Sequence, residues 1–221
     1  QWAVEEPKAD SLVIYLVDHG GEGTFRMSGT ETLSAADLDS WLDTLQENIS
    51  GKVIVVYDAC HSGSFLPALT PPADKERIVI ASASADEPAY FVTQGSISFS
   101  NYFWTHIFNG LDVGNAFDLA QNAMGSPAEL QHPLMDANGN GTGNEPGDET
   151  SAHIGNGTVI HGNVPIIGSV SPDQPVSGTS SALLYASEVT DDDGIARVWA
   201  VIRPPNYHQG SSDSPVRELP Q

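Results

Sequence analysis

Three short apolar runs are the feature that most constrains the fold of this chain of 221 residues. They read LVIYLV at residues 12–17, KVIVVY at 52–57 and RIVIASA at 77–83, and β-branched residues are frequent in all three. Continuous apolar runs of this length are typical of strands that are buried on both faces of a parallel sheet. The sequence therefore predicts at least three buried strands.

Helical patterns lie between and after these runs. Apolar residues recur at helical spacing from Ser34 to Ile49, and the Ser34 hydroxyl can cap the start of that helix. Two more helical patterns cover residues 100–110 and 114–124. A strand, helix, strand order with a helical crossover predicts an α/β fold with a mostly parallel sheet.

The composition changes twice after these elements. Residues 136–149, DANGNGTGNEPGDE, are rich in Gly, Asn and Asp, whereas PIIGSV, ALLYASEV and ARVWAVIRPP further on have the pattern of strands separated by turns. We expect a core over residues 1–130, a loop and linker over 131–163, and the start of an all-β, Ig-like module over 164–221.

The charge balance bears on the partners of the chain. It holds 29 acidic and 8 basic residues, a net charge of −21, and no Lys or Arg lies between Arg77 and Arg197. Nucleic acid is excluded as a partner because phosphate binding requires Lys and Arg. Cations are the natural ligands, and a solvated acidic surface is the alternative. No apolar run reaches the roughly 18 residues of a membrane span.

His19 and Cys60, the single cysteine, follow the first two predicted strands. The carboxyl ends of neighbouring parallel strands lie at one edge of a sheet, so an imidazole and a thiol can meet there. A nearby His can take the thiol proton or stabilise the thiolate, which is the nucleophile. Gly20 permits a tight turn, and its N–H can face a developing oxyanion. The alternatives are a buried small Cys and a polar His at a strand end.

The segments IYLVDHGG and YDACHSGSF resemble the His-Gly and Cys motifs of the caspase-like cysteine peptidases. Asp18 and the SGS after the Cys resemble legumains, and the D-x-C-H-S-G order resembles metacaspases. The resemblance implies a three-layer caspase-like fold, with Cys60 as nucleophile, His19 as general base or acid, and Gly20 in the oxyanion hole. Members of this superfamily carry further strands before the His-bearing strand, so we expect N-terminal strands to be missing from this sequence.

Asp58 lies two residues before Cys60, on the same side of the predicted strand. In the relatives an acidic residue at this place contributes to the specificity pocket, which predicts a basic P1 residue, or Asn as the second choice. Asp58 as a local hydrogen-bonding residue is the alternative. Three serines are further candidates for lining the substrate cleft: Ser82, Ser84 and Ser100.

The acidic loop opens with the D-x-[DN]-x-[DN]-G pattern of a calcium site, although Gly147 stands where the closing Glu of an EF-hand belongs. The alternatives are a looser calcium loop and a metal-free loop of Asx turns. The predicted ligands are Asp136, Asn138, Asn140, Asp148 and Glu149.

Together these features predict a cysteine endopeptidase that acts on a protein or peptide and needs no cofactor for catalysis. The alternative is a non-catalytic binding or adhesion protein with a degenerate peptidase core. The calcium-type loop and the Ig-like pattern favour a bacterial protein of the cell envelope or the extracellular space.

Overall fold

The computed structural model describes residues 11–91, 95, 97–125, 131–155, 166–172, 181–191, 195 and 198. Its main sheet has the strand order β1-β5-β6-β7. Strands β1 (Leu12–Val17), β5 (Val53–Asp58) and β6 (Arg77–Ala81) run parallel, and β7 (Leu134–Asp136) pairs antiparallel with β6. The prediction of a mixed α/β fold with a mostly parallel sheet is confirmed.

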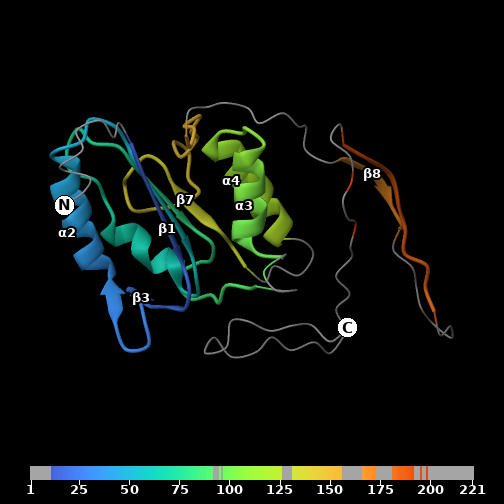
Figure 1. The fold of residues 1–221 in the computed structure, drawn as a ribbon, viewed down its shortest axis with the longest axis horizontal. Helices are drawn as coiled ribbons and strands as arrows, with labels where there is room; N and C mark the ends of the chain where they lie inside the picture. Colours follow the sequence, from blue (N-terminus) through green and yellow to red (C-terminus); the bar gives the residue numbers. More distant parts are fainter. Residues whose placement is uncertain are drawn as a thin grey trace.

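Helices cover both faces of this sheet (Figure 1). α2 (Ala35–Gln46) packs on one face, and α3 (Phe99–Phe108) and α4 (Val113–Gly125) pack on the other. Alternate residues of β5 point to the two cores, because successive side chains of a strand point to opposite faces. Val53 and Val55 join the α2 side, whereas Ile54 and Val56 join the α3 and α4 side. This is a three-layer arrangement.

Serine caps fix the starts of two helices. Ser34 Oγ accepts a hydrogen bond from Asp37 N at 3.0 Å at the start of α2, and Ser98 Oγ accepts from Asn101 N at 3.1 Å before α3. α2 ends at Gln46, three residues before the predicted end, because Asn48 N already bonds Leu45 O in a tighter turn. The cap at Ser34 is confirmed.

A second small sheet was not predicted from the sequence. β2 (Gly20–Gly21), β3 (Thr24–Arg26) and β4 (Thr32–Ser34) form an antiparallel sheet between β1 and α2. Strands of two or three residues are too short to show an alternating pattern. This sheet carries the turn that follows His19.

The C-terminal part contains β8 (Ile166–Val170) and β9 (Ala186–Thr190), which pair antiparallel. They match two of the three strand patterns predicted there. The third pattern, residues 196–205, lies outside the described residues except for position 198. One strand pair does not define a sandwich, so the Ig-like module and the domain boundaries stay predictions. Among the described residues, no helix has the length and apolar content for a membrane crossing.

Candidate active site

Cys60 lies two residues beyond the end of β5 and is 1% exposed. Its Sγ accepts a hydrogen bond from the backbone N–H of Ala89 at 3.4 Å. Burial raises the pKa of the thiol, the Ala89 N–H opposes that rise, and the Asp58 carboxylate adds to it. The sulfur therefore lies in an apolar environment with a backbone donor directed at it.

His19 lies at the corresponding position after β1. Val17 pairs with Asp58 in the parallel register, and His19 and Cys60 each come two residues later. The backbone N–H of His19 donates to Asp18 Oδ1 at 2.6 Å, and Arg26 N donates to the His19 carbonyl at 3.0 Å. The half-buried imidazole makes no hydrogen bond to any described residue. The two strand ends lie together, as predicted, while the imidazole–thiol hydrogen bond is not formed.

Gly20 lies against the backbone of Cys60. A Cβ atom at Gly20 would collide with the Cys60 carbonyl oxygen and would lie 2.6 Å from the Tyr57 hydroxyl. Because Arg26 N donates to the His19 carbonyl, the alternation of an antiparallel ladder leaves the Gly20–Phe25 pair without ladder bonds. The Gly20 N–H thus points away from β3.

A serine hydroxyl ties the two motifs together. Ser64 Oγ accepts a hydrogen bond from Gly23 N at 2.9 Å and donates to the His61 carbonyl at 2.6 Å. Gly23 belongs to the hairpin after His19, and His61 follows Cys60. The second serine of the SGS segment therefore holds the His-bearing hairpin on the Cys-bearing loop, a role that the sequence alone did not assign.

Asp58 is completely buried at the carboxyl end of β5. Its Oδ2 accepts hydrogen bonds from Ser100 N at 2.9 Å and from the Ser100 hydroxyl, and Tyr15 donates its hydroxyl to Ser100 Oγ at 2.7 Å. Burial raises the pKa of Asp58, and the hydroxyls of Ser100 and Ser82 oppose the rise. Ser82 Oγ and Asp58 Oδ1 make no hydrogen bond of normal geometry among the described residues. Two predicted pocket serines thus lie beside Asp58.

A cavity of about 480 Å³ opens on the other side of Ser100. Its walls are aromatic and polar, and Tyr15 packs edge-on against Trp104 with ring centroids 5.3 Å apart. Asp58 is not part of its lining, and Ser100, which Asp58 bonds, is. The lining residues are Tyr15, Phe91, Gly95, Ser98, Ser100, Asn101, Trp104, Thr105 and Phe108.

Ser84 lies elsewhere. Its hydroxyl donates to the His132 carbonyl at 3.2 Å, and its N–H donates to Glu87 Oε2 at 3.1 Å. The described contacts of Ser84 therefore stabilise the loop after β6. Glu87 and His132, which hold that loop, gave no signal in the sequence, because they lie 45 positions apart and neither belongs to a motif.

The acidic loop satisfies its oxygens with its own backbone. Asp136 accepts from Gly139 N and Gly141 N at 2.7 Å each, and Asp148 Oδ1 accepts from Ala137 N at 2.9 Å. Such hydrogen bonds from backbone N–H groups to Asp side chains are those of a metal-free loop of Asx turns. Burial raises the pKa of Asp136. Among the described residues, no group of three or more His, Cys, Asp or Glu side chains is placed to hold a metal ion. As arranged, these ligands do not fit a preformed calcium site, and calcium binding stays a prediction.

The fold and the two strand-end residues define an α/β protein with a His and a Cys at the carboxyl ends of neighbouring parallel strands. The family model of the Peptidase C13 family matches residues 1–117, and the chain belongs to that family. This confirms the resemblance to caspase-like cysteine peptidases. The chain is also similar to the vacuolar-processing enzyme beta-isozyme of Arabidopsis thaliana, with 33% identity over 82 residues. That match covers 37% of this chain and 17% of the relative, so it spans only a small part of the relative's length.

Proposed function

We propose that this chain is a cysteine endopeptidase in which Cys60 is the nucleophile and His19 is the general base and acid. The observation that carries the proposal is the parallel register of β1 and β5. It sets His19 and Cys60 two residues beyond the paired Val17 and Asp58. Membership of the Peptidase C13 family supports the same reaction class.

The reaction follows from these positions. His19 takes the proton of the Cys60 thiol, the thiolate attacks the carbonyl carbon of the peptide bond, and the carbonyl π electrons move onto oxygen. The Gly20 N–H, together with the Cys60 N–H, stabilises that oxyanion. When the oxyanion collapses, the C–N bond breaks and protonated His19 gives its proton to the leaving amine. Water, deprotonated by His19, then hydrolyses the thioester and releases the thiol.

The proposed specificity is for a basic P1 residue, with Asn as the second choice. When ionised, Asp58 places a negative charge behind Ser100, and aromatic rings such as Tyr15 and Trp104 can pack on a cationic side chain. The raised pKa of Asp58 favours Asn instead, because a neutral carboxyl pairs with an amide better than with a cation. Asp58 therefore supports both choices, and a peptide panel has to rank them.

The test is a panel of internally quenched peptides that differ only at P1, with Lys, Arg, Asn, Asp or Ala at that position. We expect cleavage after the basic or Asn residue, and none by Cys60→Ser, whose weaker nucleophile retains the size of the side chain. Cleavage after Asp alone would contradict the assignment of Asp58. No cleavage of any peptide by the folded chain would favour the non-catalytic binding protein instead.

Calcium binding at residues 136–149 and a bacterial cell-envelope or extracellular location are further proposals. They rest on the acidic Gly-rich loop and on the strand patterns that follow it.

A further inference from the structure

The loop after β6 contacts Cys60 and the residues that follow it. Ala89 N donates to Cys60 Sγ at 3.4 Å. The backbone carbonyl of Glu87 accepts from His61 N at 2.8 Å, and the Ala83 carbonyl accepts from Gly63 N at 2.9 Å. The position of the Ala89 N–H relative to the sulfur therefore depends on where this loop is held.

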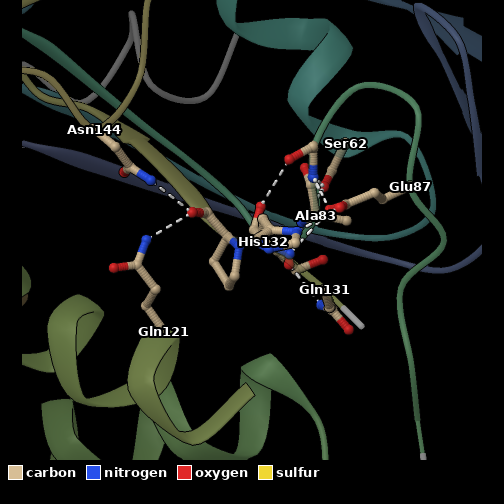
Figure 2. A network of polar contacts seen from close by, with 10 residues as sticks. Ser62, Ala83, Glu87, Gln121, Gln131, His132 and Asn144 are labelled. Carbon is tan, nitrogen blue, oxygen red and sulfur yellow. Dashed lines mark hydrogen bonds and ion pairs between the residues drawn. The ribbon is translucent and has the colours of Figure 1, made fainter. Parts of the chain in front are cut away.

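The side chain of Glu87 is the centre of the contacts that hold the loop (Figure 2). Its Oε1 lies 2.5 Å from His132 Nδ1, and its Oε2 accepts from His132 N at 2.9 Å and from Ser84 N at 3.1 Å. The pair with His132 lowers the pKa of Glu87 against the effect of burial. We call this arrangement the Glu87–His132 clasp.

The two chain neighbours of His132 in the clasp, Gln131 and Pro133, are held by hydrogen bonds as well. Gln131 donates to the Ser82 carbonyl at 2.5 Å and accepts from Tyr90 N at 2.9 Å, so it bridges the two ends of the loop. The Pro133 carbonyl accepts from Gln121 of α4 at 2.9 Å and from Asn144 at 2.9 Å (Figure 2). His132 thus lies between two anchored neighbours and offers Glu87 a fixed partner.

We propose that Glu87, held by His132, is a positioning residue that sets the Ala89 N–H on the Cys60 sulfur and so favours the thiolate. An N–H donor directed at sulfur stabilises the charged form more than the neutral form. This matters because burial disfavours that charge at Cys60. The inference rests on the proposed function only in that the thiolate is taken as the nucleophile, and it can be tested without a substrate.

The test measures the rate of iodoacetamide alkylation of the full chain as a function of pH. Cys60 is the single cysteine, so the rate reports on this thiol alone. Glu87→Gln and His132→Ala break the clasp from its two sides. Asp86→Asn removes the neighbouring exposed carboxylate and serves as the matched control. Circular dichroism first establishes that each variant is folded, and if Glu87→Gln is not, the half-exposed His132 carries the test.

In both clasp variants we expect the midpoint of the alkylation profile to move to higher pH. The rate at neutral pH should be about tenfold lower than in the wild type and in Asp86→Asn. Equal profiles for all four proteins, including no reaction at all, would overturn the proposal. So would faster alkylation at an unchanged midpoint, which would mean that Glu87 only keeps the loop closed. Shifted profiles in a chain that cleaves no peptide would contradict the proposed function and leave this inference standing.

Discussion

The Cα of Gly20 faces the carbonyl oxygen of Cys60 so closely that the space between them cannot hold a methyl group. The glycine after His19 is thus required by a backbone contact across the site. It allows the chain that follows the imidazole to lie directly on the chain that follows the nucleophile. The same contact predicts the effect of a substitution at Gly20.

Gly20→Ala should destabilise the protein by about 1–3 kcal/mol, the usual cost of overpacking. The added methyl group collides with Cys60 O, and the Tyr57 hydroxyl also has to move. Urea unfolding of both proteins measures the change. Gly29→Ala is the matched control, because a Cβ there meets nothing within 4 Å. Equal stability of Gly20→Ala and the wild type would contradict the close contact.

The strand-end residues could be predicted because each follows a continuous apolar run, and such runs align in a parallel sheet. The short strands of the β2-β3-β4 sheet could not be predicted from the sequence, since a strand such as Gly20–Gly21 has too few residues to show a pattern. The clasp is a different case: Glu87 and His132 meet only because β6 and β7 are neighbours in the sheet. No local signal in the sequence encodes that pairing.

Arg77 shows another limit of sequence reading, because its side chain is buried beneath α2. It bonds Gln46 Oε1, and it forms ion pairs of 2.7 Å with Asp39 and Asp43. Asp39 and Asp43 are only partly buried. Arg77→Ala should destabilise the chain by about 3–5 kcal/mol, since the acidic partners lose their cation and the space is left empty.

Urea unfolding measures this change as well. The matched control for Arg77 is Lys52→Ala, which removes an exposed ion pair with Glu76. That variant should change the free energy of unfolding by about 1 kcal/mol or less. A similar effect of both substitutions would argue against the buried network.

Asp58 should make stability fall with increasing pH. Burial raises its pKa in the folded protein above the unfolded value. The folded state therefore keeps this proton to higher pH than the unfolded chain does. The contribution of Asp58 is thus most favourable below about pH 4 and declines as the pH rises through the folded-state pKa. Asp58→Asn, which does not ionise, should gain stability relative to the wild type between pH 4 and pH 7.

Unfolding curves at several pH values check this prediction. The exposed Asp86→Asn serves as the control and should show no such trend. A difference between Asp58→Asn and the wild type that stays constant across this range would mean that Asp58 has the same pKa in both states.

Calcium should bind weakly, because it has to displace the hydrogen bonds that the loop makes with itself. Calorimetry with calcium on the wild type and on Asp136→Ala tests the prediction. Heat that disappears in the variant supports a calcium site. Because Asp136 also accepts from Gly139 and Gly141, unfolding has to confirm that the variant is folded. No heat at millimolar calcium, a range that includes weak extracellular sites, would rule out the prediction.

A covalent label tests most directly whether His19 activates Cys60. The full chain is incubated with a peptidyl acyloxymethyl ketone that carries Lys, Arg or Asn at P1, and the intact mass is measured. We expect one thioether adduct on Cys60 in the wild type and at least a hundredfold slower labelling in His19→Ala, in line with general acid–base catalysis. Equal labelling of the wild type and His19→Ala, or no labelling of the wild type, would contradict the activation of Cys60 by His19.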